Sequence, residues 1–122
     1  MLFRSPEVRP IVVGAGPAGL FAALVLARCG ARPILLERGQ PVEQRSRDVT
    51  HFWRTGRLDT ESNVQFGEGG AGAFSDGKLN TGTKDLRHRF ILETLVRCGA
   101  PEDILIDAKP RSEEHTSELQ SR

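Results

Sequence analysis

Apolar positions near the start of the chain predict a strand, a helix and a second strand in close succession. Residues 9–13 end in a β-branched apolar run, which predicts a short buried strand. Residues 18–28 are rich in alanine and leucine, and Pro17 stands where a first-turn proline costs no hydrogen bond, so a helix is expected. Gly30 provides a left-handed stop, and residues 33–37 form a second buried run. The pattern predicts a right-handed β-α-β unit of an α/β fold.

The pattern changes twice after this unit. Residues 41–53 place apolar side chains at near-helical spacing between charges, which predicts a helix with a loop at residues 55–56. Residues 63–82 are rich in glycine, whereas residues 85–98 return to a helical pattern with one apolar stripe. Residues 104–106 are apolar and β-branched enough to begin another strand.

Composition excludes several kinds of partner. The 17 basic and 16 acidic residues are interspersed, so neither a nucleic acid nor an acidic membrane surface is expected. Cys29 and Cys98 stand alone, with neither a CxxC pair nor metal-ligand spacing, and are expected to be reduced, partly buried thiols. The longest apolar window, residues 20–27, is too short to span a bilayer, and no signal peptide is evident. We expect a cytoplasmic protein without membrane insertion or a metal site.

A glycine-rich turn joins the first predicted strand to its helix. Gly14 permits a tight turn, Gly16 lets the backbone approach a pyrophosphate, and Gly19 lets the helix pack against the strand. Amides at the start of the helix, at its positive dipole end, bind phosphates well. The candidate phosphate-binding residues are Gly14, Gly16, Pro17, Ala18 and Gly19. Glu37 ends the second strand, where a carboxylate accepts both hydrogen bonds of an adenosine ribose. An adenine dinucleotide site is predicted.

The same turn and acid suit either FAD or NAD. Arg38 hints at a 2′-phosphate, but the adjacent Glu37 opposes it by charge repulsion. The proline-containing turn resembles that of the two-dinucleotide-binding-domain flavoproteins, where this element binds the ADP half of FAD. FAD is therefore the expected cofactor, and NAD(P)H is a candidate electron donor.

A second glycine-rich segment follows the predicted second helix. Its glycines allow main-chain amides to converge on an anion and a flat ring to approach the backbone. We expect cofactor contacts from Gly69, Gly70 and Gly72, a hydroxyl donor at Ser75 and a charge near the flavin or substrate at Lys78. A flexible hairpin that turns at residues 76–77 is the alternative.

Three segments are distinctive: Glu37-Arg38-Gly39, the run Phe66-Gly67-Glu68-Gly69-Gly70-Ala71-Gly72, and Ser75-Asp76-Gly77-Lys78-Leu79. Together they resemble the uncharacterised FAD-dependent dehydrogenase family. The resemblance covers residues 9–110. It implies the N-terminal fragment of a several-hundred-residue oxidoreductase, with a Rossmann-like FAD-binding start truncated before its sheet is complete. Related flavoproteins often place an arginine of the next segment on the FAD phosphates, and Arg45, close to Arg47, is the candidate. A solvated helix face is the equal alternative.

The end of the chain reads differently from the rest. Residues 111–121 match the translation of a common sequencing-adapter oligonucleotide at eleven consecutive positions. We therefore expect residues 1–110 to be the N-terminal part of an FAD/NAD(P)-binding domain and residues 111–122 to be a non-native tail. A natural solvated tail is the alternative. If the tail is a scar, the natural protein continues past Pro110.

The catalytic residues are not identified by the sequence, because His51 and His88 are isolated from any paired acid or nucleophile. Besides an FAD-dependent dehydrogenase, a simple NAD(P)-dependent Rossmann dehydrogenase and a non-catalytic flavin-binding protein stay open. With two secure strands, the 122-residue chain is expected to be poorly soluble and to bind FAD weakly on its own.

Overall fold

The computed structural model describes residues 8–74 and 85–106 of the 122-residue chain. The chain forms two compact units, Met1–Ser75 and Asp76–Arg122.

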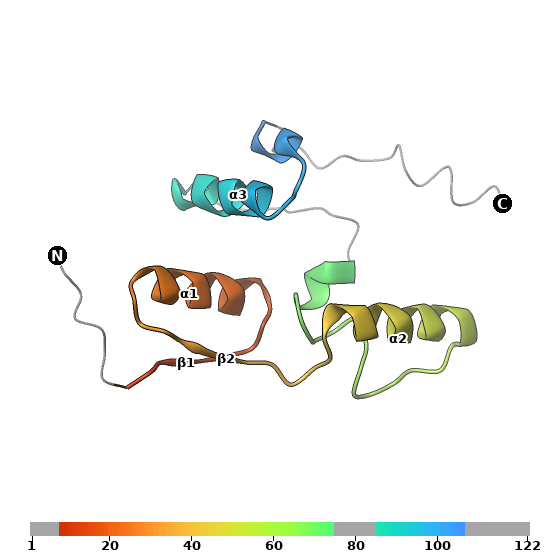
Figure 1. The fold of residues 1–122 in the computed structure, drawn as a ribbon. Helices are drawn as coiled ribbons and strands as arrows, with labels where there is room; N and C mark the ends of the chain where they lie inside the picture. Colours follow the sequence, from red (N-terminus) through yellow and green to blue (C-terminus); the bar gives the residue numbers. More distant parts are fainter. Residues whose placement is uncertain (1–7, 75–84, 107–122) are drawn as a thin grey trace. The chain divides into compact units, whose positions relative to one another are not determined.

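The first unit begins with two parallel strands joined by a helix (Figure 1). The strand β1 comprises Ile11–Val13, the helix α1 comprises Pro17–Arg28 and the strand β2 comprises Ile34–Leu36. The strands pair in parallel, with Val12 opposite Leu35. Each end of the pairing is extended by one further backbone bond, from Ile34 N–H to Pro10 and from Gly14 N–H to Leu36. The predicted parallel β-α-β start of an α/β fold is confirmed.

The limits of α1 follow from its first and last residues. Pro17 occupies the first helical turn, where its missing N–H has no intrahelical partner to lose. At the other end Gly30 takes a φ of 78°, and its N–H donates to the carbonyl of Ala27 over 2.9 Å. The N–H of Ala31 then reaches back to Leu26, which completes a left-handed helix stop. The predicted stop at Gly30 is therefore present.

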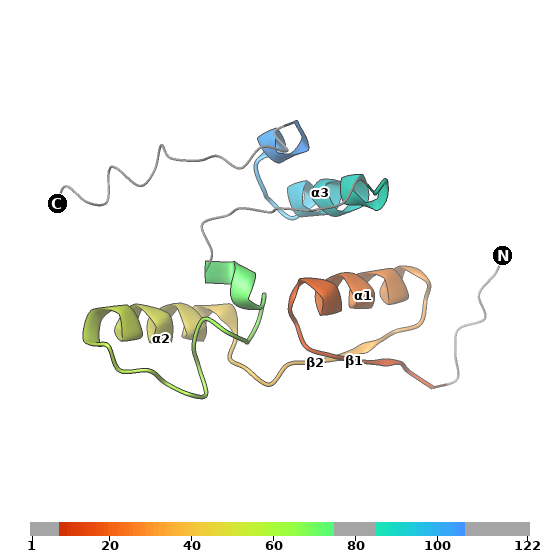
Figure 2. The same cartoon turned by 180° about the vertical axis from the view of Figure 1, so that it is seen from behind.

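The two strands are not buried on both faces, contrary to the prediction from their apolar sequence. The helix α1 lies along one face of the strand pair in both ribbon views (Figures 1 and 2), and Val12 packs toward it. Within the described residues the sheet has two strands, and Ile11 and Val13 remain 62% and 82% exposed. An apolar run shows that a strand suits a core, but burial also needs a second covering layer.

After β2, the helix α2 spans Val42–Thr55 and ends at Gly56, whose φ of 70° stops the helix. An irregular segment follows and leads to a short 3₁₀ helix η1 at Ala71–Phe74. Both ribbon views place η1 beside the start of α2 (Figures 1 and 2). The segment thus returns to the beginning of the helix that precedes it.

The irregular segment is attached to α2 by polar side chains. The hydroxyl of Ser62 donates to Oδ2 of Asp48 on α2 over 2.5 Å, and both Ser62 and Asn63 are buried. The amide of Asn63 donates to the carbonyl of Asp59 and accepts from the N–H of Gln65. The predicted helix is thus present, with the segment after it ordered by its own hydrogen bonds.

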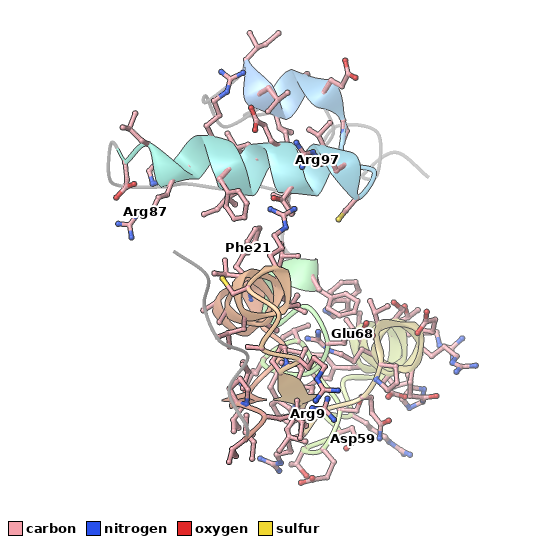
Figure 3. The ribbon with its side chains drawn as sticks, turned by 60° about the vertical axis from the view of Figure 1, so that its left-hand side comes forward. Arg9, Phe21, Asp59, Glu68, Arg87 and Arg97 are labelled. Carbon is pink, nitrogen blue, oxygen red and sulfur yellow. The ribbon has the colours of Figure 1, made fainter. Side chains whose placement is uncertain are left out.

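The second unit contains the helix α3 at Arg87–Arg97, whose two ends carry the residues Arg87 and Arg97 that Figure 3 labels. A 3₁₀ helix η2 at Glu102–Leu105 packs against α3. The strand predicted at residues 104–106 is therefore wrong. Pro101 directs the chain into a helical turn with a φ of −57°, and the acidic Glu102 and Asp103 suit the positive end of that turn.

Both cysteines are free and exposed, so the expectation that they are partly buried is wrong. Each follows the last residue of a helix, Cys29 at the end of α1 and Cys98 at the end of α3.

Candidate functional site

The first glycine turn leads directly from β1 into α1. Gly14 takes a φ of 101°, which a residue with a Cβ rarely adopts. Gly16 is the N-cap of α1, and its carbonyl accepts the first bond of the helix, from Leu20. A Cβ on Gly19 would lie 1.8 Å from the carbonyl oxygen of Gly14, so only glycine lets α1 pack this closely on the turn. The tight turn and the close packing are both present, with Pro17 and Ala18 in the first turn of α1.

Glu37, just after β2, binds the first turn through its carboxylate. Oε2 accepts from the N–H of Ala15 over 2.6 Å, and Oε1 accepts from the N–H of Gly39 over 2.7 Å. These N–H groups lower the pKa of the Glu37 carboxyl, because they stabilise its ionised form, while partial burial opposes them. The positive charge of Arg45 contributes in the same direction. Glu37 is therefore an ionised, oriented acceptor at the end of β2.

The second glycine segment docks on the first. Gly69 and Gly70 take φ values of 83° and 69°, which turn the chain through conformations that favour glycine. The N–H of Gly69 donates to the carbonyl of Ala15 over 2.9 Å. A Cβ on Gly70 would lie 3.0 Å from Cα of Gly16 and 3.2 Å from Cδ of Pro17. Backbone therefore touches backbone where the two segments meet.

The glycine-rich segment makes a second close backbone contact, with the chain just after Glu37. A Cβ on Gly39 would come within 2.4 Å of Cα of Gly67, so the chain after Glu37 also packs against the glycine-rich segment. Gly67 itself has a φ of 112°. Glycines from three parts of the first unit thus meet around the first turn of α1.

Arg38 forms an exposed ion pair, and its predicted contact with the cofactor stays a prediction. Its guanidinium contacts both carboxylate oxygens of Glu61 at 3.1 Å and lies 4.9 Å from the centre of the Phe66 ring. Both members of this ion pair are about 70% exposed. With Glu37 before it and Glu61 against it, Arg38 sits in an acidic setting that does not favour a 2′-phosphate.

Arg45 is fully buried, so the alternative of a solvated helix face is wrong for this residue. It lies in the first turns of α2 and donates to main-chain carbonyls of the glycine-rich segment. Its neighbour Arg47 is exposed and bonds to Gln44 on the same helix. The two arginines therefore differ completely in setting, although they are two residues apart.

The other predicted contacts divide into those the structure describes and those it does not. Gly72 lies in η1 with open space where a Cβ would be placed. Ser75, Lys78 and the predicted turn at residues 76–77 lie outside the described residues. Their roles stay predictions.

Sequence reasoning missed three residues that build this site. Ala15 joins the two segments, because its N–H binds Glu37 and its carbonyl accepts from Gly69. Gly39 provides the second N–H to Glu37. Glu68 accepts from the N–H of Val42 at the start of α2 over 2.7 Å, and Figure 3 labels it next to that helix. The spacing Glu-x-Gly was the one sequence signal for the bond between Gly39 and Glu37. Main-chain contacts between distant segments leave little trace in a sequence.

Among the described residues, no group of three or more histidine, cysteine or acidic side chains is arranged to hold a metal ion. None of the described helices is both long and apolar enough to cross a bilayer.

A parallel β-α-β start with a glycine turn and an acid after β2 defines an α/β nucleotide-binding fold. The family described as "FAD binding domain" matches residues 7–58, which include β1, α1, β2 and α2. A curated protein of Clostridium beijerinckii (strain ATCC 51743 / NCIMB 8052), described as an uncharacterized protein, is 59% identical over 103 residues. These residues are 84% of this chain and 19% of that relative. The N-terminal unit is thus similar to an FAD-binding domain, and the chain spans about a fifth of the relative's length.

Proposed function

We propose that this chain is the FAD-binding N-terminal part of a longer flavin-dependent oxidoreductase. The observation that carries the proposal is the docking of the second glycine segment on the first turn, directly beside the ionised Glu37. The match to an FAD-binding domain and the much longer relative support it.

The residues present fit the ADP half of FAD. A carboxylate offers about four lone-pair sites, and Ala15 and Gly39 occupy one on each oxygen of Glu37. The remaining sites suit the two ribose hydroxyls. The pyrophosphate would lie at the start of α1, where N–H groups without helical partners and the helix dipole favour anions. Gly14 and Gly16 leave this approach free of side chains.

The second segment would face the rest of the cofactor. Gly69 and Gly70 bring the chain to the first turn without any intervening side chain. Gly72, Ser75 and Lys78 are further candidates for contacts with the ribityl chain and the flavin ring. When bound, FAD would supply hydride or electron-pair transfer, and this chain's residues would bind and orient it.

The test is the visible spectrum of the full-length protein, recovered from the genomic locus and purified. A yellow protein that retains FAD through gel filtration is expected. Titration of the apoprotein with FAD and separately with NADH is the control, because a simple NAD(P)-dependent dehydrogenase would bind the second ligand alone. A colourless protein that fails to take up FAD would contradict the proposal. Bound flavin without turnover by any electron donor or acceptor would instead support a non-catalytic flavin-binding protein.

A further inference from the structure

Arg45 has a hydrogen-bonding arrangement that the proposed function does not by itself require. Its Nε and Nη2 donate to the carbonyl of Asn63 at 3.3 and 3.2 Å, and Nη2 also donates to Val64 at 3.3 Å. Nη1 donates to Glu68 at 2.5 Å and to Gly70 at 3.0 Å. A guanidinium has five N–H donors, so these five bonds occupy its full capacity. In this arrangement no donor is left for a phosphate.

Each carbonyl that Arg45 binds fixes the direction of the next N–H. In a trans peptide the C=O of one residue and the N–H of the following residue point in opposite directions. The bond from Arg45 to the carbonyl of Glu68 therefore turns the N–H of Gly69 away from Arg45, and that N–H donates to Ala15. Arg45 is thus connected to the first glycine turn through one peptide unit.

The surroundings of the guanidinium hold it in this place. Arg45 is 0% exposed, and its guanidinium carbon lies 4.8 Å from the centre of the Phe74 ring. A Cβ on Gly67 would collide with Cδ of Arg45 at 2.4 Å, so the glycine there gives the side chain its path. A buried cation is costly unless it is fully hydrogen-bonded. A planar guanidinium spreads five donors over three nitrogens, whereas an ammonium has three donors on one nitrogen.

We infer that Arg45 is a positioning residue of the nucleotide site, holding residues 63–70 so that Gly69 and Gly70 stay docked on Ala15 and Gly16. Arg45 acts on the cofactor through this segment rather than by touching a phosphate. The inference rests on the proposed function for the identity of the cofactor, but the docking of the segment is independent of it.

The test compares three variants of the full-length protein. Arg45→Lys keeps the charge but has its donors on one nitrogen. That nitrogen cannot reach the carbonyls of residues 63–64 and those of residues 68 and 70 at the same time. Arg45→Ala removes charge and donors, and Arg54→Met is the matched control, because Arg54 is an exposed arginine of the same helix. Hydrogen exchange of residues 63–74 and FAD affinity are measured for each. Millimolar guanidinium chloride is added to Arg45→Ala, with sodium chloride at equal ionic strength as its control.

Both Arg45 variants should exchange faster at residues 63–74 while β1, α1 and β2 keep their protection. Their FAD affinity should fall at least about tenfold, which is about 1.4 kcal/mol. Guanidinium should restore part of the affinity of Arg45→Ala, and Arg54→Met should match the wild type. If Arg45→Ala fails to fold, Arg45→Lys provides the same comparison.

Unchanged exchange at residues 63–74 in the Arg45 variants would overturn the inference. Faster exchange with an unchanged FAD affinity would also overturn it, because the segment would then be held without consequence for the site. If the wild type binds no FAD, the proposed function fails, and the exchange data still decide whether Arg45 holds the segment.

Discussion

Ala15 N–H and the Glu37 carboxylate form a direct link between the first glycine turn and the end of β2, with 2.6 Å between Ala15 N and Oε2. The carboxylate is thus oriented before any ligand arrives, since Gly39 holds its other oxygen. Pre-oriented acceptors bind a ligand with less loss of side-chain freedom. In the proposed FAD site, Glu37 would therefore hold both the turn and the ligand.

Replacing Glu37 by glutamine should weaken FAD binding by at least about tenfold, since a hydrogen bond to a charged group contributes about 1.5–3 kcal/mol. A glutamine presents an NH₂ group where one of the two N–H donors needs an acceptor. Quenching of flavin fluorescence on titration measures the effect. Glu93→Gln, which removes one carboxylate from α3, is the control. Equal affinity for Glu37→Gln and the wild type would refute the role of Glu37.

The stability of the protein should depend on the ionisation of Glu37 at acid pH. The folded protein lowers the pKa of this carboxyl, so its contribution is complete above the ordinary value of 4.5 and is lost as the pH falls through the lowered value. Urea unfolding of the wild type and Glu37→Gln should therefore differ most at neutral pH, and the difference should shrink on acidification. A difference that grows as the pH falls would show that the sign is wrong.

Gly19→Ala should destabilise the first unit by roughly 3 kcal/mol, because overpacking forces the backbone to shift. The added Cβ would lie 1.8 Å from the carbonyl oxygen of Gly14. Gly72→Ala is the control, since no atom lies within 4 Å of a Cβ at that position. The midpoint of urea unfolding measures both variants. Equal midpoints would mean that α1 does not pack on the turn as described.

Gly70→Ala should lower FAD affinity by moving the second segment away from the first turn. Its Cβ would press on Gly16 and Pro17 at 3.0 and 3.2 Å. The left-handed conformation adds a backbone cost of about 1–2 kcal/mol for any residue with a Cβ. Gly30→Ala carries the same kind of backbone cost at a φ of 78° with open space around it. We expect urea unfolding to show a loss of stability in both variants, larger in Gly70→Ala because of the added contacts. Titration with FAD should show weakened binding in Gly70→Ala alone.

The 122-residue chain by itself should associate in solution and bind FAD weakly. Val13 is 82% exposed and Ile11 is 62% exposed on the open face of the strand pair. Exposed apolar patches of this kind lead to self-association. Analytical ultracentrifugation across a concentration series measures the association. A monomer with micromolar FAD affinity would contradict this prediction.

The tail provides a separate test of the chain's natural extent. We propose that residues 111–121 derive from a sequencing adapter and that the gene continues after Pro110. Sequencing of clean genomic DNA across the locus should give different codons from residue 111 onward. A stop codon directly after Ser121 would exclude this origin.

The β-α-β start was predictable because it depends on local features. Apolar runs at 9–13 and 33–37, a proline in the first helical turn and a glycine at the stop each act within a few residues. The burial of the strands was not predictable in this way, since the run in Ile11–Val13 is as apolar when exposed as when covered. The apolar pattern of a strand shows which side chains prefer a core, but it does not show whether another layer covers them.

The candidate site was predictable where one motif holds its residues and not where distant segments meet. The turn at Gly14 and the close packing at Gly19 could be predicted, because the first needs a positive φ and the second leaves no room for a Cβ. Arg45 could not be distinguished from an exposed helical arginine, because its carbonyl partners lie about twenty residues further along the chain. Ile104 was assigned to a strand from its apolar neighbours, whereas Pro101 had already directed the chain into a helical turn.

The contact between Gly69 and Ala15 also bears on how the protein folds. These residues are separated by about fifty positions, and contacts between distant residues form late because they must close a long loop. The β-α-β unit can form first from neighbouring residues, and the second glycine segment packs on it afterwards. We therefore expect the last event of folding in this unit to be the assembly of the proposed nucleotide site, so that retention of a cofactor would indicate a completed fold.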